Sequence, residues 1–190
     1  MPGPRPILAA LSSALLLACA DQSVTPPLIE HHHHAPAQSR AADNSAAQNK
    51  INAVIRQATA RYHRVEVAED DGYEPFGPCV PGMGYHYLNW GLLLNGTVDP
   101  ARPEILVYEP QKNGSLKLVA AEFMVRAEDW DPYHDEPPML GSREFDDHRP
   151  LGSGGPPFPH YQLHAWVWMN NPDGIYSPFN PRSSCKYAVN

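Results

Sequence analysis

Three polar side chains interrupt stretches of the sequence that otherwise have the pattern of buried strands. His86 lies between two tyrosines, Glu122 lies in a segment whose two alternating faces are both mostly apolar, and His164 shares a face with Trp166 and Trp168. A buried carboxylate without a partner is costly, and a metal ion is one usual remedy. Two histidines and a carboxylate are donors that suit Zn, Fe or Cu and leave positions open for water or substrate. We therefore expect His86, Glu122 and His164 to bind one of these ions.

Two further residues are candidates for the rim of such a site. His160 and His164 share a face of one strand but are four residues apart, which is about 13 Å. If Asn113-Gly114 is a two-residue turn, Glu122 pairs with Ile105 and Glu109 pairs with Leu118, which separates the two acids by the same distance. Glu109 and His160 are therefore expected at the rim and not among the ligands.

The same residues are open to other interpretations. His86 could donate a hydrogen bond to Glu122 or to a backbone carbonyl, so that the group only stabilises the core of a non-metal ligand-binding or structural protein. The group could also act in acid–base catalysis, or hold the metal of a metal-dependent enzyme. The sequence contains no GxSxG, HExxH or Walker A pattern, so no catalytic residue is assigned.

The elements that position these residues predict an α+β fold. Ser45 and Gln48 form a capping-box pattern. The residues that then recur at helical spacing and predict one apolar stripe are Ala47, Ile51, Val54, Ile55, Ala58 and Tyr62, and those that lie off this stripe are Asn52, Arg56, Gln57 and Arg61. Strand patterns follow at 84–94, 104–108, 116–125 and 161–169. We expect one N-terminal amphipathic helix packed on an antiparallel sheet, with barrel-like curvature and long Pro-rich loops. The longest loop, 126–159, is expected to lie over the site.

The N-terminal residues indicate export. Arg5 precedes an apolar run from Ile7 to Ala18, which is too short to span a bilayer, and the run ends in Leu16-Leu17-Ala18-Cys19. This ending resembles the lipobox of bacterial lipoproteins, which implies cleavage of residues 1–18 and a lipid anchor on Cys19. Ala20 at the next position resembles the outer-membrane sorting pattern. The alternative is an ordinary signal peptide cleaved near Ala20.

Cysteine usage agrees with an exported chain. The sequence has three cysteines, and if Cys19 is acylated, Cys79 and Cys185 remain as a pair for a disulfide in an oxidising compartment. Residues 19–44 lack a hydrophobic period and read as a flexible tether. The tether contains His31 to His34, which either collect metal loosely or are a low-complexity linker run. Residues 45–190 are expected to form a single domain.

Composition limits the partners. The net charge is −7, with no Lys/Arg cluster, which argues against a nucleic-acid partner. The expected partners are the membrane, through the lipid anchor, and a small-molecule ligand.

Three segments of the chain resemble a family of uncharacterised secreted bacterial proteins. They are CVPGMGYHYLN (79–89), PEILVYEP (103–110) and LHAWVWMNNPDGIYSPFNPRSSC (163–185). The resemblance implies a common exported domain and supplies no activity.

Overall fold

The computed structural model describes residues 3, 45–150, 152 and 155–189. The expected signal peptide, the Cys19 anchor, the tether and the His31–His34 run lie outside these residues. No helix in the described part of the chain is long and apolar enough to cross a membrane. The helical elements in chain order are α2 (Ala46–Thr59), the 3-10 helix η1 (Ala60–His63), α3 (Val65–Asp70), α4 (Trp90–Leu93) and α5 (Ala127–Trp130). The strands are β1 (Glu74–Val80), β2 (Gly84–Leu88), β3 (Ile105–Pro110), β4 (Leu116–Arg126), β5 (Met139–Leu140), β6 (Arg143–Glu144), β7 (Asp146–Asp147) and β8 (His160–Ala165).

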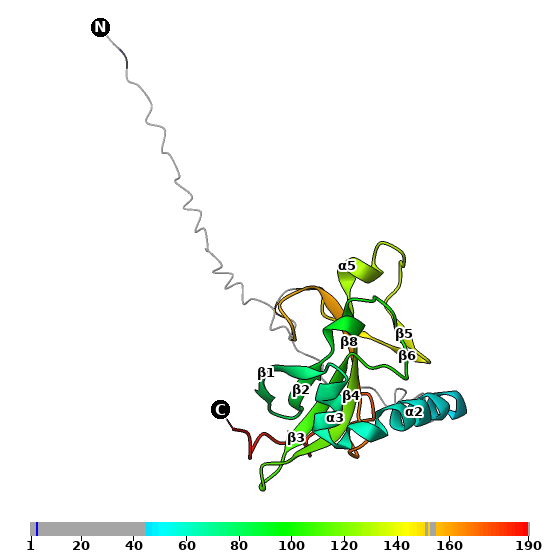
Figure 1. Ribbon diagram of the computed structural model, residues 1–190. Coiled ribbons are helices and arrows are strands. Elements are labelled where there is room, and N and C mark those ends of the chain that lie inside the picture. The colour runs from blue at the N-terminus through cyan, green and yellow to red at the C-terminus, as the bar shows by residue number, and fades with distance from the viewer. Residues whose placement is uncertain (1–2, 4–44, 151, 153–154, 190) are drawn as a thin grey trace. The chain divides into compact units, whose positions relative to one another are not determined.

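The fold is α+β, with one antiparallel sheet of six strands in the order β1-β2-β3-β4-β8-β7 (Figure 1). Strands β1 to β4 form a meander, and β8 joins it beside β4. The expected α+β class is confirmed, but the barrel-like closure is wrong. The sheet stays open because its end strands, β1 and β7, pair on one side only and do not meet.

Helices α2 and α3 cover one face of the sheet. Ile55 of α2 packs with Phe123 and Leu163, and Ala68 of α3 packs with Leu106 and Tyr108. The opposite face has no long helix among the described residues. Its core consists of Leu88, Leu93, Ile105, Val107, Val119, Ala120, Met124 and Trp166. Phe158, near the end of the 126–159 segment, packs against this second core.

The first helix begins as the sequence predicts, but its buried side is not the predicted one. The Gln48 backbone N–H donates to Ser45 Oγ over 3.1 Å, which caps the helix. The buried positions are Gln48, Asn52, Ile55 and Thr59, whereas Val54 of the predicted apolar stripe is 39% exposed. Polar residues can face the core here because the Gln48 amide and the Asn52 oxygen are both bonded to the hydroxyl of Tyr176.

The strands differ from the sequence patterns at their ends. The predicted strand 84–94 stops at Leu88, and Asn89 then caps α4 by accepting the backbone N–H of Leu92 over 3.1 Å. Strand β1 was not predicted, because Pro75, Gly77 and Pro78 are typical of a loop. An edge strand tolerates prolines, since its outer N–H groups need no partner.

The hairpin that leads to Glu122 contains two compensating irregularities. Gln111 donates its backbone N–H to Ser115, so the loop has three residues and ends on Gly114 with φ of 83°. This loop pairs Glu109 with Lys117 and not with the predicted Leu118. A bulge next to Val107 then shifts the register by one, so that Ile105 does pair with Glu122 as predicted.

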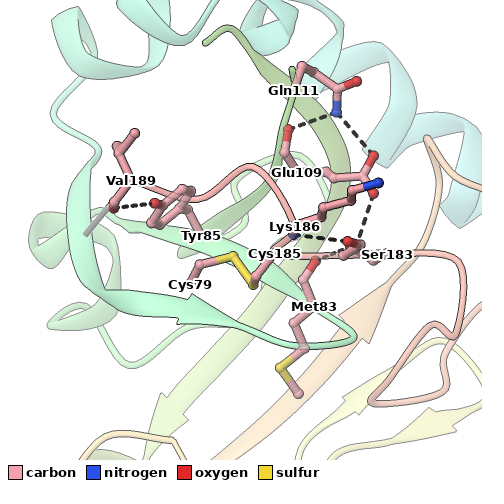
Figure 2. The surroundings of a disulfide bond; sticks show 10 residues. Cys79, Met83, Tyr85, Glu109, Gln111, Ser183, Cys185, Lys186 and Val189 are labelled. Carbon is pink, nitrogen blue, oxygen red and sulfur yellow. Dashed lines mark hydrogen bonds between the residues drawn. A yellow bond between two sulfur atoms is a disulfide. The ribbon is translucent and has the colours of Figure 1, made fainter. Parts of the chain in front are cut away.

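The C-terminal residues form a strap across the β1–β2 hairpin (Figure 2). Cys79 and Cys185 are joined by a disulfide, as the sequence predicted, which is compatible with an exported protein. Hydrogen bonds reinforce the strap. Ser183 Oγ donates to the Met83 carbonyl over 2.6 Å, and the Tyr85 hydroxyl donates to the Val189 carbonyl over 2.8 Å.

Candidate metal centre

The strand register brings His86, Glu122 and His164 together from three strands. Glu122 on β4 is directly opposite His164 on β8, and on its other side it pairs with Ile105 of β3. His86 on β2 pairs with Val107, two residues along β3 from Ile105, so its side chain reaches the same face. This is the face opposite α2 and α3, where Leu93 of α4 and Phe158 pack.

Both histidines approach the same carboxylate oxygen. Glu122 Oε2 lies 3.4 Å from His86 Nε2 and 3.4 Å from His164 Nε2. One ligand atom from each of the three residues lies within 4.8 Å of the other two. In the described part of the chain, this is the group of three or more acids, histidines or cysteines that could hold a metal ion.

The two contacts to Glu122 Oε2 are longer than ordinary hydrogen bonds and match the spacing of two ligands on one metal ion. An N–H···O hydrogen bond is usually 2.9–3.0 Å long. Glu122 Oε2 and both ring nitrogens of His164 are buried and have no hydrogen-bond partner among the described residues. In a tetrahedral zinc site with bonds of about 2.0–2.1 Å, adjacent ligand atoms are about 3.3–3.4 Å apart. The two contacts to Oε2 have this length.

Burial sets the protonation of all three groups. Side-chain exposure is 12% for His86, 2% for Glu122 and 1% for His164. Desolvation lowers the pKa of His86 to about 4, and desolvation together with the neighbouring His86 and His148 lowers that of His164 to about 3. Both imidazoles are therefore neutral near pH 7, which is the form that binds a metal.

Glu122 is shifted in the opposite direction for the same reason. Burial, assisted by the charges of Glu104 and Asp146, raises its pKa to about 8. Near pH 7 the carboxyl group is thus mostly protonated, and the short contacts to the histidines are not ion pairs. A bound cation would supply the positive partner that the ionised form of Glu122 needs in this buried position.

His160 belongs to a separate polar cluster on β8. Its Nδ1 lies 2.7 Å from the Phe158 carbonyl oxygen, and its Nε2 lies 3.2 Å from Gln162 Oε1. The other end of the Gln162 amide lies 3.2 Å from His148 Nε2. Burial is the main cause that lowers the pKa of His160. Glu109 lies elsewhere, where it accepts the backbone N–H of Ser184 over 3.1 Å. Neither residue is part of the three-residue group.

Sequence reasoning missed Asp146, which faces the same side of the sheet. Asp146 lies on β7, where it pairs with Gln162 of β8. Its Oδ2 is buried without a hydrogen-bond partner among the described residues. Burial raises the pKa of Asp146 to about 6. The sequence pattern places this residue in the long 126–159 loop. A two-residue strand is too short to give a period-two pattern, so the sequence offered no indication of this placement.

No family model, curated protein or solved structure matches this chain. The resemblance to secreted bacterial proteins and to lipoproteins therefore stays a prediction.

Proposed function

We propose that this chain is an exported, envelope-anchored protein whose sheet binds one transition-metal ion through His86, Glu122 and His164. The observation that carries the proposal is the pair of 3.4 Å contacts from the two imidazoles to a single buried carboxylate oxygen. Neutral imidazoles and a carboxylate suit Zn, Fe or Cu, and three protein ligands leave a coordination position open.

The surroundings of the group favour loading from the His86 side. His86 is the only one of the three ligands with appreciable exposure, 12%, so an ion would reach Glu122 and His164 past its ring. The ligand nitrogens of His86 and His164, which lie within 4.8 Å of each other, must also move closer together. Tetrahedral geometry requires about 3.3 Å between them. We expect the loaded and metal-free forms to differ by ring rotations around β2 and β8.

The test is metal stoichiometry in a chain that lacks the His31–His34 run. The mature chain is prepared with alanine at residues 31–34 and without a polyhistidine tag, and its metal content is measured by elemental analysis and titration calorimetry. We expect one ion per chain. His86→Ala, His164→Ala and Glu122→Gln should each abolish stoichiometric binding.

His134→Ala is the matched control, because His134 is an exposed histidine that stacks on Trp130 away from the group. It should leave the metal content unchanged. Absence of stoichiometric metal in the parent chain, or equal metal content in parent and His86→Ala His164→Ala protein, would rule the proposal out. The nearly isosteric Glu122→Gln keeps the test valid if a histidine variant fails to fold.

The proposed anchor is tested separately. Thioether-linked lipid on Cys19 predicts that the mature chain fractionates with membranes and that its N-terminal peptide carries the mass of an acylated cysteine. Cys19→Ser should release the protein from the membrane fraction. An unmodified N-terminus near Ala20 would instead indicate ordinary signal-peptide cleavage.

A further inference from the structure

A second site candidate lies where the chain leaves the sheet after β8. A cleft of about 690 Å³ is bounded by one side of α2 and by the irregular segment 166–175. This volume is within the range typical of small-molecule sites. The cleft is lined by different residues from the His86–Glu122–His164 group, so its argument is independent of the metal proposal.

The charge of the cleft is opposite to that of the protein. Arg56 is the only charged residue among the described residues that line it, although the chain as a whole has a net charge of −7. Within the described part of the chain, Arg56 makes no ion pair or side-chain hydrogen bond. Its guanidinium carbon stands 5.8 Å from the centre of the Trp168 ring. A guanidinium with unused donors suits a carboxylate, which it can bind in a bidentate manner.

Trp168, the aromatic neighbour of Arg56, is held in place by other side chains. Trp168 Nε1 donates to Thr59 Oγ1 over 3.0 Å, and the edge of the His63 ring packs against the indole at 4.3 Å between centroids. The indole is thus held against the end of α2, and the exposed Arg56 guanidinium lies over its ring. A cation that already contacts an aromatic ring loses less conformational entropy on binding an anion than an arginine without such a contact.

Asparagine amides add hydrogen-bond donors to the same cleft. The Asn52 oxygen already accepts the Tyr176 hydroxyl, and the Asn170 oxygen accepts a hydrogen bond from Arg182 over 2.6 Å. Their oxygens are therefore engaged, and their NH₂ groups are the part that a ligand can use. Met169 and Ile175 provide apolar, half-buried surface beside them.

We propose that this cleft binds a small hydroxylated carboxylate of the sugar-acid class. The cation would hold the carboxylate, the amides would donate to hydroxyl oxygens, and the apolar side chains would contact the carbon face of the ring. No carboxylate side chain lines the described cleft, so it offers few acceptors for a neutral or cationic ligand.

The experiment compares matched ligands by tryptophan fluorescence and titration calorimetry on the mature chain. D-glucuronate and D-galacturonate are the probes, and D-glucose is the uncharged counterpart. We expect saturable binding of at least one uronate and at least tenfold weaker binding of glucose. The Glu122→Gln chain should bind the uronate equally well, which separates this site from the metal proposal.

Two substitutions locate the binding. Arg56→Gln removes the cation from an exposed helix position and should weaken uronate binding about tenfold or more, since hydrogen bonds to charged groups are the stronger kind. Asn170→Asp adds a negative charge of nearly the same shape and should have a similar effect. Arg64→Gln, outside the cleft, is the control and should bind as the parent does.

The proposal is overturned if neither uronate binds saturably, if glucose binds as tightly as the uronates, or if Arg56→Gln and Arg64→Gln bind alike. Loss of uronate binding in the Glu122→Gln chain would also overturn the proposal. It would mean that the uronate carboxylate binds a metal ion at the three-residue group and not Arg56 in the cleft.

Discussion

Replacing Glu122 with glutamine should stabilise the metal-free protein and at the same time destroy the proposed metal site. Burial raises the pKa of Glu122 from 4.5 to about 8. A raised carboxyl pKa means that the folded state is fully stable below pH 4.5 and loses stability as the pH rises towards 8, because the unfolded chain ionises first. Each unit between these values costs about 1.4 kcal/mol. At pH 7 the penalty is about 3 kcal/mol, and glutamine does not ionise.

The assay is urea unfolding of the metal-free parent and of Glu122→Gln at pH 4.5, 7 and 8.5, followed by tryptophan fluorescence. The two curves should nearly coincide at the lowest pH and separate by about 3 kcal/mol at pH 7. Addition of metal should nearly close this gap. Metal at about a hundred times its Kd stabilises the parent by about 2.7 kcal/mol and leaves the variant unchanged.

Glu109→Gln is the control for this experiment. Glu109 is a half-buried acid on β3 whose carboxylate accepts hydrogen bonds from Ser184 and Gln111 and does not approach the histidines. Its replacement should leave the response to metal unchanged.

A structural His–Glu network predicts the opposite result for Glu122. If the carboxylate served only to hold His86 and His164 by hydrogen bonds, its loss would destabilise the metal-free protein by about 1–3 kcal/mol. A Glu122→Gln protein that is less stable than the parent at pH 7, with no response of either protein to metal, would therefore refute the reasoning.

Three further predictions concern residues outside the three-residue group. Cys79→Ser Cys185→Ser opens a loop with a sequence separation of 106 and should lower the free energy of unfolding by up to about 5 kcal/mol, measured by urea unfolding against the parent with and without reductant. Glu104→Gln should stabilise the protein at pH 8 but not at pH 4, because burial raises the pKa of Glu104 to about 8; a pH-independent effect would contradict this. Tyr176→Phe leaves the buried Asn52 oxygen without its donor and should cost about 1–3 kcal/mol, checked by thermal unfolding, whereas no loss would mean that the contact is dispensable.

The three candidate ligands could be predicted from the sequence because each breaks a strand pattern in a way that has few explanations. The register that joins them was predicted correctly for Glu122, but partly for the wrong reason. The sequence predicts a two-residue turn, whereas the loop before Ser115 has three residues. A one-residue slip would have placed Glu122 on the helix-covered face. The bulge beside Val107 restores the pairing, and a bulge has no sequence signature in this strand.

The helix shows what local pattern cannot reveal. The sequence places Asn52 among the solvent-facing residues, yet it is 8% exposed, because its partner Tyr176 lies 124 residues further along the chain. Likewise, Gln48 accepts hydrogen bonds from Ser142 at a separation of 94 residues. The period of the apolar residues predicts only the apolar side of a helix. It cannot reveal hydrogen-bond partners that lie far away in the sequence and allow a polar side to be buried.

The order of the strands also has a kinetic consequence. Strands β1 to β4 pair with their neighbours in sequence, so they can assemble through short loops, whereas β8 must close a long intervening segment before it adds beside β4. We therefore expect His164 to be the last of the three ligands to reach its place in the sheet. We expect a metal ion to bind after the rate-limiting step of folding, and hence to slow unfolding while leaving the refolding rate almost unchanged.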